Sequence, residues 1–205
     1  MNASSNVSIR RAVPADADFL AAIEQSGGEL FRTLPELAWI ADEPIGTADE
    51  FLPLILAGTV WVAEAGVSGI VGELRATIAD DALHIVELAV SRQFQRHGIG
   101  RALIDAAAKW SRVRGLRALT LTTFRHVAWN APFYARYGFV ERSGDARLDR
   151  IVRGEESRGL PNRVARMKTV PQAIAVAGLA AAGSLWQAER FAQMRLGAAR
   201  YFATL

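Results

Sequence analysis

Hydrophobic and polar positions in the first half of the chain follow the short period of β-strands, with turn residues between the runs. Three runs rich in β-branched and apolar residues cover 59–64, 70–78 and 83–90. They are separated by the turns at Gly66–Gly69 and Asp80–Asp81. Two tight connections in succession indicate an antiparallel meander.

The spacing of apolar residues changes after residue 98. Ile99, Leu103 and Trp110 recur at helical spacing, and this pattern predicts a helix over 98–114. A strand over 118–123 follows it. The order strand, helix, strand favours a parallel crossover at this point.

The other predicted elements complete an α+β domain with a mixed, mostly antiparallel sheet flanked by helices. They are a strand over 7–12, a helix over 14–25 stopped by Gly27–Gly28, an irregular or partly helical stretch over 29–47, a helix over 51–57 with its N-cap at Thr47, a short helix over 130–137 ended by Gly138, strands over 139–141 and 163–168, and a charged helix over 148–157. We therefore predict a domain over residues 1–169.

Residues 170–205 have a different character and form a predicted C-terminal extension. Residues 173–186 are an alanine-rich apolar run of 14 residues, shorter than the roughly 20 apolar residues of a membrane-spanning helix. We expect one or two extra helices that pack on the domain or on a partner subunit. In the second case the protein would be a homodimer. A loosely ordered tail is the alternative.

The composition is that of an ordinary globular protein, with 51% hydrophobic and 22% charged residues among 205. The chain has no cysteine, which excludes disulfides, thiolate metal sites and a cysteine nucleophile. The three histidines do not have metal-ligand spacing, so no metal site is predicted. Residues 1–6 lack the features of a secretory signal, and we expect a cytoplasmic protein.

The net charge of +3 conceals an uneven distribution. The formal charge is −10 over residues 1–90, +7 over 91–126 and +6 over 127–205. This pattern suits an anionic ligand at the middle segment and a cationic partner at the N-terminal part, although solvated surfaces would explain it equally well. No basic tract is interleaved with aromatic residues, so nucleic-acid binding is not expected despite the high isoelectric point.

The strongest local signal is the segment from Val90 to Arg101, where a strand is followed by a polar loop and by two glycines at a helix start. Glycine allows backbone N–H groups to approach a ligand, and a helix N-terminus attracts anions. Position 103 is leucine, which does not fit the dinucleotide-binding motif. The helix start Gly100-Arg101-Ala102 does not fit a P-loop either.

Two segments together resemble the GNAT superfamily of acyl-CoA-dependent N-acetyltransferases. The first is Glu87-Leu88-Ala89-Val90 followed by Gln95-x-x-Gly98-x-Gly100, which is similar to the acetyl-CoA motif of that family. The second, about 35 residues later, is Asn130-Ala131-Pro132-Phe133-Tyr134 with a closing Gly138-Phe139. The resemblance covers about 160 residues and implies a GNAT-like fold with two splayed parallel strands. The proline that often follows the first strand is absent, and the C-terminal extension lies outside the family pattern.

The resemblance also implies roles for individual residues. Acetyl-CoA would be the acyl donor, with its pantetheine arm on the backbone of the strand at 88–90 and its pyrophosphate on the turn at 95–101. Asn130 would meet the arm from the other side. The residues expected to bind the cofactor are Leu88, Ala89, Val90, Gln95, Arg96, His97, Gly98, Ile99, Gly100, Arg101 and Asn130.

The implied chemistry is direct attack of an amine on a thioester, which needs a base and a proton donor for the leaving thiolate. The resemblance places Tyr134 near the thioester sulfur, and a tyrosine is protonated at neutral pH. Its alternative role is core packing. For the base we favour Glu87, a carboxylate in an otherwise apolar strand, acting through water. It could instead face outward or form a salt bridge, and Glu73 is a weaker candidate.

We therefore expect an N-acetyltransferase that acts on a small-molecule or polyamine-like amine. The resemblance implies an acceptor pocket built by the stretch over 28–47, whose acidic residues suit a cationic amine. A non-catalytic acyl-CoA sensor and a protein N-terminal or lysine acetyltransferase are the alternatives. Neither the acceptor, the acyl chain length nor the oligomeric state follows from the sequence.

Overall fold

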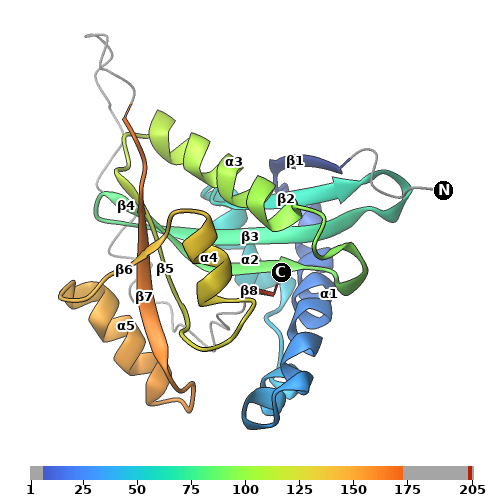
Figure 1. The fold of residues 1–205 in the computed structure, drawn as a ribbon. Coiled ribbons are helices and arrows are strands. Elements are labelled where there is room, and N and C mark those ends of the chain that lie inside the picture. The colour runs from blue at the N-terminus through green and yellow to red at the C-terminus, as the bar shows by residue number, and fades with distance from the viewer. Residues whose placement is uncertain (1–6, 173–202, 205) are drawn as a thin grey trace, which may run out of the picture.

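The computed structural model describes residues 7–172 and the backbone of Ala203–Thr204 (Figure 1). These residues form one mixed sheet in which seven strands follow the order β1-β2-β3-β4-β5-β7-β6, and an eighth pairs with β4. The strands are β1 (Val7–Arg11), β2 (Val60–Ala65), β3 (Ile70–Ala79), β4 (Ala82–Val90), β5 (Ala118–Phe124), β6 (Val140–Glu141), β7 (Arg163–Thr169) and β8 (Ala203–Thr204).

Helices cover both faces of this sheet (Figure 1). The α-helices of the described residues are α1 (Ala17–Gly28), α2 (Ala48–Leu56), α3 (Ile99–Val113), α4 (Ala131–Arg136) and α5 (Ala146–Glu156). The stretch between α1 and α2 contains two 3₁₀ helices, η2 (Glu29–Thr33) and η3 (Pro35–Asp42). The predicted α+β fold with a mixed sheet is therefore confirmed.

The alternation of side chains along the strands divides the core into two layers. On one face, Leu74, Leu88 and Leu119 pack in the same cluster as Leu103 of α3 and Tyr134 of α4. The opposite face carries a second cluster, which joins α1 and α2 to β2. The fold thus places the glycine turn and α4 over one face, and α1 and α2 over the other.

The face opposite α3 is polar where α5 covers it. Glu155 of α5 is fully buried and accepts hydrogen bonds from Thr122 (2.6 Å) and Arg163 (2.7 Å). A buried carboxylate is tolerated when such donors surround it. This network fixes α5 on β5 and β7.

Neighbouring strands are antiparallel except at β4, which is parallel to β5 and to β8. The pairing of β4 with β5 extends only from Ala82 to His84 on β4, matched with Ala118 to Thr120 on β5. No further β4–β5 pair occurs in the described residues toward the carboxyl ends of the two strands. The expected splay of two parallel strands is therefore present.

The first helix extends beyond its predicted end at residue 25. Gly27 and Gly28 do not stop α1, which runs through both buried glycines and continues into η2. Glu29 N–H bonds back to the carbonyl of Gln25, so the helical turn is maintained across the glycines. Glycine disfavours a helix by only about 1 kcal/mol, which tertiary packing readily overrides.

Other predicted boundaries agree to within a few residues. Thr47 is the N-cap of α2 in a capping box with Glu50, and Gly138 has the left-handed φ of +83° expected after α4. The extra helices predicted over 173–186 lie outside the described residues. The domain boundary at residue 169 stays a prediction. Within residues 7–172, no helix is long and apolar enough to cross a bilayer.

Candidate active site

The glycine turn after β4 has a strained, closely braced backbone. Gly98 has φ of +80° and precedes the first residue of α3, and Arg96 also has a positive φ of 65°. The buried Gln95 donates through Nε2 to the carbonyl of Val90 (3.0 Å). His97 donates through Nδ1 to the carbonyl of Gln95 (2.7 Å). Gln95 and His97, both expected to bind the cofactor, thus use their side chains to hold the turn.

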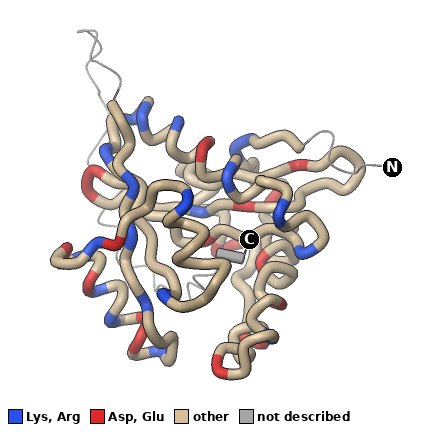
Figure 2. The backbone as a smooth tube through the Cα atoms, in the orientation of Figure 1, with Lys and Arg blue, Asp and Glu red and all other residues tan. Residues whose placement is uncertain are grey.

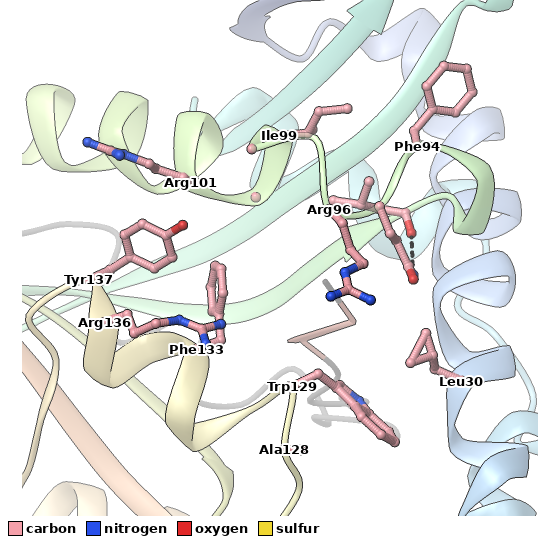
Figure 3. A pocket seen from close by; sticks show the side chains of 14 residues that line it. Leu30, Phe94, Arg96, Ile99, Arg101, Ala128, Trp129, Phe133, Arg136 and Tyr137 are labelled. Carbon is pink, nitrogen blue, oxygen red and sulfur yellow. Dashed lines mark hydrogen bonds between the residues drawn. The ribbon is translucent and has the colours of Figure 1, made fainter. Parts of the chain in front are cut away.

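This turn forms one wall of a cavity of about 600 Å³. The opposite wall comes from α4 and the loop before it, and Leu30 of η2 closes one end (Figure 3). Of the predicted residues, the cavity is lined by Val90, Gln95, Arg96, Gly98, Ile99, Gly100 and Arg101. The first N–H groups of the 15-residue α3 have no partner within the helix, and the helix dipole favours an anion at this end. The cavity therefore suits a ligand with phosphate groups.

The splay lies beside this wall. Leu88 and Ala89 are on the part of β4 that has separated from β5, where β8 pairs with them in parallel through its backbone. An unpaired strand edge offers N–H and C=O groups to any extended ligand. In this structure the chain's own Ala203–Thr204 occupies that edge.

Asn130 is placed at the start of α4 and is almost fully buried. Its backbone carbonyl accepts the N–H of Tyr134 (3.1 Å). Its side-chain Oδ1 has no hydrogen-bond donor among the described residues. A buried amide oxygen without a donor is unfavourable, so Asn130 has the capacity to accept one hydrogen bond from a ligand.

Tyr134 and Glu87 are both buried, at 2% exposure each. The Tyr134 ring packs against Phe133 and Phe139, with centroids 5.2 and 5.4 Å away. Burial and, next, the negative charge of Glu87 raise the pKa of Tyr134 above its ordinary value. The two groups are thus electrostatically coupled, and the tyrosine is protonated at neutral pH. Neither residue lines the cavity itself.

Glu87 sits at an irregularity in β4. Arg75 is the partner of Glu87 and the next β3 residue, Ala76, is the partner of Ile85, so Val86 is an extra residue in β4. Such a bulge re-aims neighbouring side chains. The Glu87 carboxylate accepts the N–H of Leu88 (3.1 Å). The predicted base therefore lies beside the strand edge that the splay exposes.

A buried group of charges surrounds this position on the α1 and α2 face. Arg75 forms an ion pair with Glu24 of α1 and lies 4.4 Å from the centroid of the Phe51 ring of α2. Its Nε also lies 3.0 Å from Glu73, without hydrogen-bond geometry. Burial raises the pKa of Glu73 to about 7, an effect that Arg75 opposes and Glu24 reinforces. This acceptor-face cluster is defined as Glu24, Glu73, Arg75 and Glu87.

The acidic residues over 28–47 were expected to form a pocket for a cationic amine, but two of them pair with an arginine instead. Arg32 pairs with both Glu29 (2.9 Å) and Asp42 (2.8 Å) at the surface. Asp and Glu recur along α1 and the turns after it, whereas Lys and Arg recur along α3 (Figure 2). Buried carboxyl groups are instead concentrated in the acceptor-face cluster, which holds three of them and one guanidinium.

The sequence analysis missed several residues of the cavity. They come from the loop after β4, from η2, and from α4 and the residues on either side of it, and they are Leu30, Phe94, Ala128, Trp129, Phe133, Arg136 and Tyr137. Phe133 and Tyr137 could have been noticed, because they lie within the second motif. Arg136 lies in the same motif, but a charged residue on the exposed side of a short helix is common and does not by itself indicate a function.

Comparison with known proteins agrees with this arrangement. The family of the acetyltransferase (GNAT) domain matches residues 57–141. The fold is similar to that of PaiA N-acetyltransferase from Thermoplasma acidophilum, solved in complex with coenzyme A, at 17% identity and a TM-score of 0.62 over 80% of this chain and 99% of that one. It is also similar to Rv2747 from Mycobacterium tuberculosis, at 20% identity and a TM-score of 0.60 over 80% of this chain and 99% of that one.

A third similar structure is the ribosomal-protein-S18-alanine N-acetyltransferase from Escherichia coli, at 15% identity and a TM-score of 0.60, over 85% of this chain and 100% of that one. At these identities the likenesses establish the fold. The family match over 57–141 indicates the class of the protein, an acyltransferase. Residues 57–141, which include both sequence motifs, match the family of the acetyltransferase (GNAT) domain, so the predicted resemblance is confirmed.

Proposed function

We propose that this protein transfers the acetyl group of acetyl-CoA to the amine of a small cationic molecule. The observation that carries this proposal is one arrangement: the glycine turn and α4 face each other across a cavity of about 600 Å³, beside the splay of β4 and β5. Acetyl-CoA has an anionic end and an extended, amide-containing arm. The glycine turn is complementary to the anionic end, and the splayed edge of β4 is complementary to the arm.

The donor would bind with its pyrophosphate on the N–H groups of Gly98 to Gly100, with Arg96 adding positive charge from the loop. Its arm would lie along Leu88 and Ala89, and Asn130 Oδ1 would accept a hydrogen bond from one of its amides. Because β8 occupies the same edge of β4, binding there requires β8 to leave. The similar PaiA and Rv2747 structures were solved with coenzyme A.

In the transfer step, Glu87 would accept a proton from the incoming ammonium, directly or through a water. The neutral amine nitrogen then attacks the thioester carbon, and the carbon–sulfur bond breaks. Tyr134 would donate its proton to the departing thiolate, and the proton that the attacking nitrogen loses as the amide forms would restore the tyrosine. Since the charge of Glu87 raises the pKa of Tyr134, protonation of Glu87 removes that contribution and makes the tyrosine a better donor at the moment when the thiolate forms.

The preference for a cationic acceptor rests on the acceptor-face cluster. Its three carboxylates exceed its single guanidinium, and all four side chains are at least nine-tenths buried. Burying several carboxyl groups together is costly unless protons or cations compensate their charge. An ammonium group entering from the α1 and α2 face would supply this compensation.

The test is release of free thiol from acetyl-CoA with a panel of diamines, polyamines, neutral-side-chain amines, and peptides with a free N-terminus or lysine. We expect turnover with the cationic small amines. Tyr134→Phe should lower kcat roughly 100-fold or more, as expected for loss of a general acid, while the fold and acetyl-CoA affinity persist. Ser111→Ala, which removes another fully buried hydroxyl, is the matched control and should retain activity.

Two results would overturn the proposal. Tight acetyl-CoA binding with no turnover on any amine would favour a sensor. Turnover restricted to the peptides would instead assign the protein to the protein-modifying acetyltransferases.

A further inference from the structure

The open end of the cavity carries two arginines from opposite walls. Arg101 extends from the first turn of α3 and Arg136 from the last turn of α4, and both are exposed. Tyr137 lies between them (Figure 3). The Arg101 guanidinium is 5.8 Å from the centroid of the Tyr137 ring, and that ring packs on Phe133 with centroids 4.5 Å apart. We call Arg101, Arg136 and Tyr137 the cationic rim.

The positive charge of this rim is only weakly compensated. Arg101 has one acidic neighbour, Asp105, at 3.5 Å on the exposed surface of α3, and such a pair contributes little. Within residues 7–172, no carboxylate forms an ion pair with Arg136. Two exposed cations that face one cavity form a local anion-binding site.

The orientation of the donor follows from burial. Glu87 and Tyr134 are buried, so the acetyl end of the donor must reach inward, and its nucleotide end must lie toward the exposed rim. Coenzyme A carries a pyrophosphate and a separate 3′-phosphate on its ribose. The N–H groups of the glycine turn and Arg96 suffice for the pyrophosphate, which leaves the cationic rim for the second phosphate.

On the basis of the proposed function, we propose that Arg136, together with Arg101 across Tyr137, binds the 3′-phosphate of coenzyme A and makes the enzyme discriminate against donors that lack it. A guanidinium matches the geometry of a phosphate and binds it more strongly than a neutral donor does. Acyl groups carried on phosphopantetheine without the nucleotide would be poor donors for the same reason.

The experiment compares the dissociation constants of coenzyme A and 3′-dephospho-coenzyme A by titration calorimetry at low salt. We expect the wild-type protein to prefer coenzyme A roughly tenfold, equivalent to about 1.4 kcal/mol. In Arg136→Ala, coenzyme A binding should weaken until the two ligands bind about equally, while dephospho-coenzyme A binding changes little. Arg142→Ala removes another exposed arginine, outside the cavity, and should keep the wild-type preference.

Other outcomes would refute the assignment. If Arg136→Ala weakens both ligands by the same factor, Arg136 contacts the pyrophosphate or only adds general charge. If the wild type does not distinguish the ligands, no 3′-phosphate site exists, although the proposed function stands. If the wild type binds neither ligand, the proposed function fails and this assignment fails with it.

Discussion

The two sides of the β4 strand differ in how their charges are held. On the side of α3 and α4, a cavity of about 600 Å³ is bordered by the exposed Arg96, Arg101 and Arg136. On the side of α1 and α2, the charges of the acceptor-face cluster are buried, and Arg75 lies within ion-pair distance of Glu24 and Glu73. The first side is shaped by backbone geometry and is open to a ligand. The second is closed, and its electrostatics depend on a balance of four buried groups.

The open side should be the easier one to disable by a single change. We expect Gly98→Glu to weaken coenzyme A binding by at least about 100-fold, or 2.8 kcal/mol. Gly98 has φ of +80° at the N-cap of α3, where a side chain is strained, and the new carboxylate repels the phosphates. Titration calorimetry measures the change directly.

The matched control is Gly115→Glu. Gly115 has a similar φ of +73° and follows the other end of the same helix, away from the cavity. The Gly115→Glu substitution should lower the stability of the protein but leave its affinity for coenzyme A near the wild-type value. Equal affinity in Gly98→Glu and wild type would mean that the turn does not bind the phosphates.

The contrast between the two sides also explains what the sequence could and could not predict. The turn at 95–100 is a contiguous segment whose glycines are required by local backbone geometry, so its position and type were visible without the structure. The acceptor-face cluster brings Glu24 of α1 against Arg75 of β3, 51 residues apart in the chain. Nothing local marks such a pair, because either residue alone resembles an ordinary surface charge.

Local signals likewise explain where the predicted elements succeeded and failed. The capping box at Thr47 and the left-handed glycine after α4 depend only on neighbouring residues. Tertiary structure therefore does not shift these two helix ends. Gly27 and Gly28 are weak helix breakers, and burial of α1 against the sheet determined their conformation instead. Arg136 was missed because only the facing α3 wall gives its position a functional meaning.

The closed side can be tested through the pH dependence of stability. The pKa of Glu73 is raised to about 7 by burial, so the folded protein holds this proton more tightly than the unfolded chain does. The stabilisation from this group is complete below the unfolded pKa and is lost as the pH rises through 7. Glu73→Gln stays neutral, so the stability of the variant relative to wild type should increase between pH 5 and pH 8 by roughly 2 kcal/mol.

Urea unfolding at the two pH values gives this difference. Glu156→Gln, which neutralises an exposed carboxylate of α5, is the control and should show no such increase. Arg75 keeps Glu24 as a partner in the Glu73 variant, so the comparison does not leave the guanidinium unpaired. Parallel stability profiles for Glu73→Gln and wild type would mean that burial does not raise the pKa of Glu73.

The smallest expected effect concerns β8, which links the two sides because it lies on the edge of β4 between them. Ala203 and Thr204 pair with Leu88 and Ala89, the backbone proposed for the pantetheine arm. If strand and ligand exclude each other, the apparent affinity for coenzyme A equals the intrinsic affinity multiplied by the fraction of molecules in which the edge is free. Deletion of residues 203–205 should therefore strengthen coenzyme A binding about two- to fivefold.

The control for this deletion is Thr204→Val, which keeps the backbone groups of β8 and should bind coenzyme A like the wild type. Pantetheine gives a second measurement, because it has the arm but lacks the phosphates. Its affinity should increase by the same factor as that of coenzyme A, since competition occurs at Leu88 and Ala89 and not at the cationic rim. An unchanged affinity for both ligands would mean that the arm does not use this edge of β4.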